Sequence, residues 1–256
     1  MASSRGDDST GGTVKVVIVE VRYPYKSLSH NIPRLYSLSQ ITHRNPSASK
    51  IIEVEVKLRL PDSNAHQKLS DLLSPYHTKT HLQQNLFFDT PSLTLANAHR
   101  AALRLRFYDF DSEAILSLKS KPVISVGISR IEEEDEPLDP SLTRACAAEP
   151  WRFSTIDKSK TLKRVKEEFG VNLMEVVSLG GFRNVRAVHK CYGLKLELDE
   201  TQFDFGVNYE IECESDDPDE AKLMLEELLN QNGIRFSYSQ VLKFAIFRSG
   251  KLPEFK

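Results

Sequence analysis

Six short segments alternate apolar and charged residues, and the charged ones are of the kinds that bind phosphate and divalent cations. The segments span residues 52–59, 103–106, 118–121, 130–134, 195–199 and 209–214. A β-strand projects successive side chains to opposite faces, so each segment would gather its charges on one face. Arginine and lysine bind phosphate oxygens, whereas carboxylate oxygens bind hard cations such as Mg²⁺. A surface carrying both kinds could hold a polyanion together with its metal ions.

Alternation is also the ordinary pattern of a half-buried strand with a solvated face. Three features favour charges that point inward. Signs are segregated by strand, with Arg104 and Arg106 on one face and Glu210 and Glu212 on another. Paired carboxylates two residues apart lie within about 7 Å, a spacing that one cation can bridge. The amphipathic segment 218–230 needs an apolar surface, which the outside of a barrel would provide. The pattern alone leaves both interpretations open.

The elements that must position these residues are mostly strands. Helices are predicted at 62–73, 159–169 and 217–230, and a final segment around 241–247 carries Lys243. Neither a βαβ alternation nor a Gly-rich phosphate loop is present, which excludes Rossmann-like and P-loop folds. The prediction is a mainly β, α+β fold: a closed antiparallel eight-stranded tunnel barrel with flanking helices. Its strands are expected at 52–59, 83–89, 103–107, 114–121, 129–134, 173–179, 185–190, 194–199 and 207–214.

Composition narrows the class of protein. The formal net charge of −2 over 256 residues argues against a general nucleic-acid binder. No apolar run approaches the ~20 residues of a membrane span, so we expect no membrane partner. Three distant cysteines, Cys146, Cys191 and Cys213, have no metal-ligand or redox spacing and suit a reducing compartment.

Residues 1–50 differ from the rest. Residues 22–50 are Ser-rich and lack acidic residues, as in an organelle transit segment, whereas Asp7, Asp8 and Glu20 speak against one. We expect residues 1–50 to be a disordered or targeting extension and residues 51–256 to be the functional domain. The expected location is the cytoplasm, with the plastid as the alternative.

Glu53-x-Glu55-x-Lys57 near the start of a β-rich module resembles the signature of the CYTH superfamily, the triphosphate tunnel metalloenzymes. Phe-Phe-Asp-Thr-Pro at 87–91 and the segment 243–253 resemble short plant members of this family. The resemblance spans residue 51 to about residue 253, and the N-terminal extension is a departure from it. Further similar motifs are Arg104-x-Arg106, Lys119-x-Lys121, Arg130-x-Glu132-x-Glu134, Arg186, Glu197-x-Asp199, Glu210-x-Glu212 and Lys243.

The resemblance implies a monomeric enzyme that hydrolyses inorganic triphosphate to pyrophosphate and phosphate with Mg²⁺ or Mn²⁺. It implies metal ligation by Glu53, Glu55, Glu132, Glu134, Asp199, Glu210 and Glu212. It implies substrate binding by Lys57, Arg104, Arg106, Lys119, Lys121, Arg186 and Lys243. Lys57, Glu134 and Asp199 would act in catalysis, while Arg59, Arg130, Lys195 and Glu214 would pair with neighbours.

Two other functions remain open. One is hydrolysis or cyclisation of an organic triphosphate: thiamine triphosphate, a nucleoside triphosphate, or ATP to cyclic AMP. Such an enzyme should offer an aromatic or apolar shelf, for which Phe107, Tyr108 and Phe110 are the candidates. The other is a non-catalytic polyphosphate sensor, which would need the basic residues but not the paired carboxylates.

Overall fold

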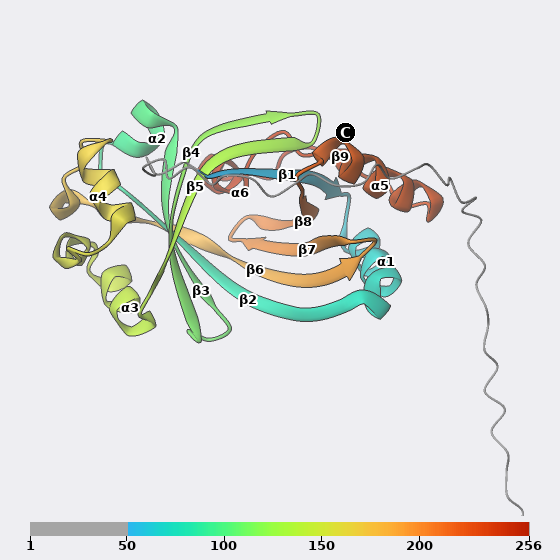
Figure 1. Cartoon of the computed structure of the whole chain (residues 1–256), viewed down its shortest axis with the longest axis horizontal. Helices are drawn as coiled ribbons and strands as arrows, with labels where there is room; N and C mark the ends of the chain where they lie inside the picture. Colours follow the sequence, from blue (N-terminus) through green and yellow to red (C-terminus); the bar gives the residue numbers. More distant parts are fainter. Residues whose placement is uncertain (1–50, 256) are drawn as a thin grey trace, which may run out of the picture. The chain divides into compact units, whose positions relative to one another are not determined.

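Within residues 51–255, which the computed structural model describes, eight antiparallel strands close into a barrel (Figure 1). The sheet order is β5-β4-β3-β2-β6-β7-β8-β1, and pairing of β1 with β5 closes the ring. A short ninth strand pairs with the end of β1. The strands are β1 (Ile51–Leu60), β2 (His77–Asp89), β3 (Ala101–Tyr108), β4 (Glu113–Ser125), β5 (Ile128–Leu138), β6 (Val177–Cys191), β7 (Leu194–Phe203), β8 (Gly206–Glu214) and β9 (Ser237–Tyr238).

The predicted mainly β barrel with flanking helices is confirmed, with local differences. Residues 173–175 form a 3₁₀ turn rather than a strand, and β6 runs from 177 to 191 as one long strand. The segment around Lys243 is a helix. The helices are α1 (Ser63–Leu73), α2 (Thr94–His99), α3 (Pro140–Ala148), α4 (Lys160–Glu167), α5 (Pro218–Gln231) and α6 (Lys243–Ser249).

The caps of the predicted helices explain where they begin. The Asp62 side chain accepts a hydrogen bond from the backbone N–H of Ala65 at the start of α1. Asp217 caps α5 in the same way, and Pro218 occupies its first turn. Both residues satisfy backbone donors that a helix start leaves without partners.

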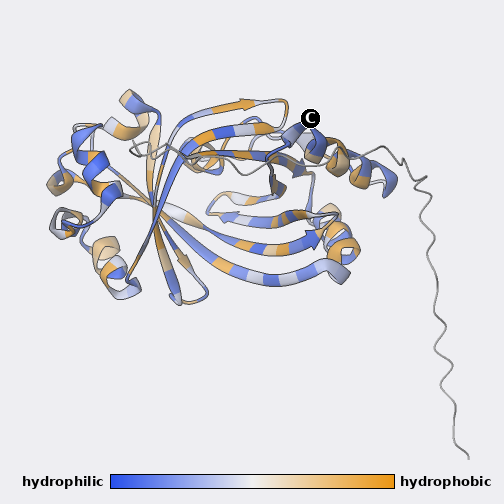
Figure 2. Ribbon diagram, viewed as in Figure 1, coloured by the Kyte–Doolittle hydropathy of each residue, from blue (hydrophilic) through white to orange (hydrophobic). Residues whose placement is uncertain are grey.

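The apolar faces of the strands point outward and are covered by helices. Leu58 of β1 and Ile211 of β8 pack with Leu225 of α5 in one buried cluster. Leu105 of β3 packs with Leu162 of α4 in another. The strands therefore show alternating hydrophilic and hydrophobic colours along their length (Figure 2). The interpretation in which all the charged faces look outward is wrong, although Glu132 and Glu134 of β5 do lie on the outer face, near Arg164 of α4.

The boundary predicted near residue 50 cannot be compared with structure, because residues 1–50 lie outside the described residues. The extension proposed there stays a prediction. No helix in the described 51–255 range is both long and apolar enough to cross a membrane. All three cysteines are buried with free thiols.

Candidate functional site

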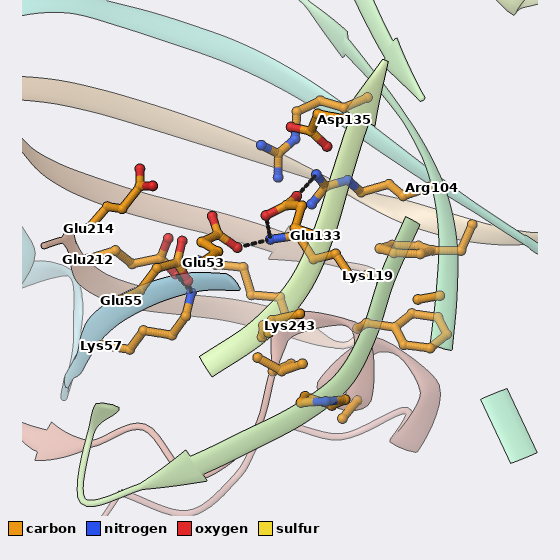
Figure 3. Close-up of a pocket in the computed structure, with 18 of the residues that line it drawn as sticks. Glu53, Glu55, Lys57, Arg104, Lys119, Glu133, Asp135, Glu212, Glu214 and Lys243 are labelled. Carbon is orange, nitrogen blue, oxygen red and sulfur yellow. Dashed lines mark hydrogen bonds and ion pairs between the residues drawn. The ribbon is translucent and has the colours of Figure 1, made fainter. Parts of the chain in front are cut away.

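The barrel encloses a tunnel-like cavity of about 400 Å³ lined largely by ionisable side chains (Figure 3). Seven of the described lining residues are acidic: Glu53, Glu55, Glu133, Asp135, Glu197, Glu212 and Glu214. Eight are basic: Lys57, Arg100, Arg104, Arg106, Lys119, Arg186, Lys195 and Lys243. Opposite charges in near balance allow this wall to stay folded, because unpaired buried ions would cost several kcal/mol each.

The signs are sorted around the ring. All seven carboxylates come from β7, β8, β1 and β5, which are consecutive neighbours in the sheet. Four of the cations come from the other side: Arg104 and Arg106 on β3, Lys119 on β4 and Arg186 on β6. Strand order thus creates an acidic wall and a basic wall from segments that are scattered along the chain.

Lys57 lies within the acidic wall. Its Nζ is 2.6 Å from Glu55 Oε2 and 2.8 Å from Glu212 Oε1. Burial favours the neutral amine, but Glu212 and Glu55 outweigh burial and hold the pKa of Lys57 well above its ordinary value. Lys57 is therefore a fixed positive charge and cannot serve as a proton acceptor.

Two residues of the basic wall, Arg104 and Arg106 on β3, carry positive charge that their partners do not balance. Arg104 NH2 lies 2.8 Å from Ser117 Oγ and 3.4 Å from Glu133 Oε1, while its buried Nε has no hydrogen-bond partner among the described residues. Burial and the neighbouring Arg106 lower the pKa of Arg104. Arg106 donates to Asn85 Oδ1 at 2.8 Å and makes no ion pair within the described part of the chain. This wall favours an anion.

The acidic wall shows the opposite imbalance. Glu55 and Glu214 are direct cross-strand partners of β1 and β8, an arrangement that is unfavourable for like charges. Burial and the nearby Glu53 raise the pKa of Glu214, with further contributions from Glu55 and Glu197. This wall favours a cation.

Asp199 and Glu210, which are direct cross-strand partners on β7 and β8, are buried and do not line the cavity. Asp199 is fully buried, 2.6 Å from Arg186 NH2 and 2.8 Å from Lys243 Nζ. Burial would raise its pKa, but Arg186 and Lys243 hold the pKa of Asp199 below its ordinary value. Glu210 accepts from Ser239 and lies 3.1 Å from Lys243. These two carboxylates position cations rather than face the cavity.

Glu212 joins the two groups of residues. It lies 2.6 Å from Arg186 and 2.5 Å from Lys243, in addition to its contact with Lys57. Burial would raise its pKa, but Lys243, Lys57 and Arg186 hold the pKa of Glu212 well below its ordinary value. The network also includes an ion pair between Arg186 and Glu197.

Three predicted site residues lie outside the tunnel. Glu132 and Glu134 point to the outer face of β5, where Glu132 lies 3.2 Å and Glu134 3.6 Å from Arg164 of α4. Lys121 lies within a register shift in β4, has φ +50°, and extends outward to Glu132 at 3.1 Å. In contrast to the prediction, these three residues do not line the cavity.

The inward residues of β5 are instead Glu133 and Asp135. Glu133 pairs across the sheet with Lys119, and its Oε2 lies 2.7 Å from Lys119 Nζ. Lys119 also lies 2.7 Å from Glu53. Burial would raise the pKa of Glu133, but Lys119 and Arg104 outweigh it and lower that pKa. Glu133 therefore remains a carboxylate.

Sequence reasoning missed further lining residues. Lys195 and Glu214, expected only to pair with neighbours, line the cavity, and so does Arg100. Their position on the inward parity of β7 and β8 was the available signal for Lys195 and Glu214. Arg100 lies in a turn between α2 and β3, where alternation gives no indication.

One end of the cavity is apolar. Phe87 of β2 and Phe244 of α6 have ring centroids 4.6 Å apart, and Phe182 of β6 lies 5.5 Å from Phe87. Of the three aromatic residues singled out from the sequence, only Tyr108 lines the cavity. Phe107 is buried in the outer core, and Phe110 is 91% exposed in a turn.

The donor set fits hard cations in type, because every acidic lining residue offers oxygen. Glu55 Oε2 is buried and makes no hydrogen bond among the described residues, although Lys57 lies within ion-pair distance. Within residues 51–255, no three His, Cys, Asp or Glu residues are already gathered closely enough to hold a metal. The carboxylates are spaced by the lysines and arginines that lie between them.

A sequence model of the CYTH domain matches residues 51–241. No curated protein sequence was found to match the chain. A solved structure from Hippeastrum, described as an adenylyl cyclase candidate with a dominant triphosphatase activity, is 52% identical. It has a TM-score of 0.76 and covers 78% of this chain and 97% of its own. An adenylate cyclase candidate from Bacillus halodurans shares the fold, with 19% identity, a TM-score of 0.61, and 77% and 98% coverage. The chain belongs to the CYTH domain family.

Proposed function

We propose that this protein hydrolyses inorganic triphosphate to pyrophosphate and phosphate with the help of Mg²⁺ or Mn²⁺. The observation that carries the proposal is the sorted charge of the tunnel: a basic wall that favours an anion faces an acidic wall that favours cations. A phosphate chain with bound divalent cations satisfies both walls. The triphosphatase activity described for the Hippeastrum relative supports this choice.

The lysine and arginine side chains that line the tunnel would bind the substrate. Arg104 is buried and Arg106 is half-buried, and both lie on the same face of β3, where their guanidinium groups are suited to bidentate contact with non-bridging phosphate oxygens. Lys57, Lys119, Arg186 and Lys243 supply further positive charge around the cavity. Each of these four is now paired with carboxylates, so a phosphate chain would compete for them.

The carboxylates of the acidic wall would bind the metal ions. Glu53, Glu55 and Glu212, together with Glu214, would hold one cation, and Glu133 with Asp135 would hold or orient a second. A bound divalent cation neutralises phosphate charge and lowers the pKa of water. Asp199 and Glu210 act as positioning residues, since they hold Arg186 and Lys243 in place.

The charges of Lys57 and Glu133 determine which of them can accept a proton from the attacking water. Lys57 stays protonated, so its catalytic role is to neutralise charge on the reacting phosphoryl group. Glu133 stays ionised and faces the cavity, so it can orient the attacking water and accept its proton. It takes the role that the sequence motif suggested for Glu134.

The direct test measures phosphate release from tripolyphosphate with Mg²⁺ or Mn²⁺, with and without chelator. We expect turnover that chelator abolishes and that Glu55→Gln abolishes in a folded protein. Metal-independent turnover, or full activity of Glu55→Gln, would refute the metal assignment. Tight binding of tripolyphosphate without turnover under any condition would identify a sensor.

The apolar end of the cavity favours one second candidate, a triphosphate bearing an organic group. The wall formed by Phe87, Phe182 and Phe244 begins beside Arg104, the cross-strand partner of Phe87. Organic triphosphates would place their ring on this wall. Comparing kcat/KM for tripolyphosphate, ATP and thiamine triphosphate, with an assay for cyclic AMP, separates the two. A clear preference for an organic substrate that is lost in Phe244→Ala would establish the second candidate.

We further propose a monomer that works without nucleic-acid or membrane partners. Its location would be the cytoplasm, or the plastid if residues 1–50 act as a transit segment. Fluorescent-protein fusions with and without residues 1–50 test the location. Equal distribution of the two fusions would exclude targeting by this segment.

A further inference from the structure

Arg59 is a buried cation that the tunnel does not use. β1 places Glu53, Glu55 and Lys57 along the tunnel, and Arg59 is the next residue on the same face, about 7 Å beyond Lys57. Arg59 is 8% exposed and lines a separate cavity of about 650 Å³. This C-terminal cavity lies between β9, the segment 240–241 and residues 251–254.

The hydrogen-bond partners of Arg59 are all neutral. Its Nε donates to Asn208 Oδ1 at 3.1 Å, and its two terminal nitrogens donate to the backbone oxygens of Glu254 and Pro253, each at 3.0 Å. No carboxylate among residues 51–255 lies within ion-pair distance, in contrast to Lys57, which has two. Burial lowers the pKa of Arg59, and the more distant Glu210 offsets this only in part. A buried cation without a counter-ion is costly unless an anion joins it.

Other donors stand around the same space. Lys251 brings a second positive charge to the cavity, Ser237 a hydroxyl and Gln240 an amide. The amide nitrogen of Asn208, next to Arg59, is buried without a hydrogen-bond partner in the described part of the chain. A guanidinium group has five N–H donors, and the hydrogen bonds to these three oxygens leave others available.

We propose that the C-terminal cavity is a second anion site, which binds inorganic phosphate between Arg59 and Lys251. It is distinct from the tunnel but shares a wall with it: Gln240 and Val241 line this cavity, whereas the following residues, 242–245, line the tunnel. The proposal does not depend on the proposed function, since phosphate binding requires no turnover.

Calorimetric titration of the full chain with inorganic phosphate in chelator tests the proposal. We expect two classes of site, of which saturating tripolyphosphate displaces only the tunnel class. Arg59→Met should weaken the second class at least tenfold and keep the first, which also shows that the variant is folded. Arg106→Met is the matched control and should do the reverse. Lys251→Gln, at an exposed position, should weaken the second class several-fold without any risk to folding.

A single class of phosphate sites that tripolyphosphate displaces fully would overturn the proposal. So would a second class that Arg59→Met and Lys251→Gln leave unchanged. The source of the phosphate is resolved by one turnover of terminally labelled tripolyphosphate in excess unlabelled phosphate. If the labelled phosphate stays bound to the protein, it was delivered from the tunnel. If unlabelled phosphate replaces it completely, the site binds phosphate from solution. This arm alone rests on the proposed function.

Discussion

Adjacent carboxylates on β5 provide a sharp test of which residues face the tunnel. Glu133 and Glu134 have the same side chain and neighbouring positions but point to opposite faces of the strand. Glutamine in place of either keeps the shape and removes the charge. The proposed site predicts that Glu133→Gln destroys hydrolysis and that Glu134→Gln does not.

The magnitudes follow from the contacts. Glu133 is 2.7 Å from Lys119 and 3.4 Å from Arg104, both proposed to bind substrate. Loss of a group that merely orients a metal ligand costs about 10- to 100-fold in affinity or activity. Loss of a proposed ligand should therefore lower kcat/KM at least about 100-fold, or about 2.7 kcal/mol. Glu134 is partly exposed and contacts Arg164 at 3.6 Å, so its loss should cost only about 0–1 kcal/mol of stability.

Both variants are assayed for phosphate release from tripolyphosphate at saturating metal and for thermal unfolding. We expect Glu134→Gln to keep native kcat/KM and to show at most a small fall in Tm. Native activity in Glu133→Gln, or a greater loss of activity in Glu134→Gln, would refute the assignment of the inward face. A calorimetric metal titration of both variants separates lost metal binding from lost proton transfer.

Three further predictions concern other parts of the barrel. Lys119→Ala should raise KM for tripolyphosphate at least about tenfold, as expected for a charge-assisted contact, whereas Lys121→Ala should leave steady-state kinetics unchanged. The folded-state pKa values of Asp199 and Glu212 lie below their ordinary values of 3.8 and 4.5. The ionised carboxylates therefore stabilise the folded protein fully above those values, and this stabilisation is lost as the pH falls below them. We expect Tm to drop in acid, and to drop less in a Glu212→Gln variant. A Cβ on Gly181 would lie 1.8 Å from a backbone oxygen of β2, so Gly181→Ala should cost about 1–3 kcal/mol in a denaturant titration.

The strands and the closed barrel were predictable because several strands, such as β3, carry an uninterrupted apolar outer face. Leu103, Leu105 and Phe107 alternate with Arg104 and Arg106 without interruption, and the structure keeps that alternation throughout β3. The same regularity holds for β1 and β8. In these strands one parity is apolar and the other charged, so the sequence specifies the inward face without ambiguity.

The predictions of which residues face inward failed where the alternation of apolar and charged residues is broken or absent. β4 carries a register shift between Ser120 and Val123, so Lys121 does not share a face with Lys119 despite their spacing. In β5, residues 132–136 are all acidic, and both parities offer carboxylates. The choice between Glu132/Glu134 and Glu133/Asp135 is made by pairing with β4 and β1, which no local pattern records.

The sorting of charge around the tunnel likewise depends on sheet order rather than on any segment alone. The acidic wall joins β7 and β8 to β1 and β5, which precede them in the chain and are themselves separated by β2, β3 and β4. Pairing of β1 with β8 brings Glu55 opposite Glu214, residues far apart in sequence, and makes a local excess of negative charge. Because β3, with Arg104 and Arg106, lies across the ring, the opposite excess builds up there. The affinity for a metal-bound polyanion is therefore a property of the closed barrel, and a chain that folded into an open sheet with the same residues would lack it.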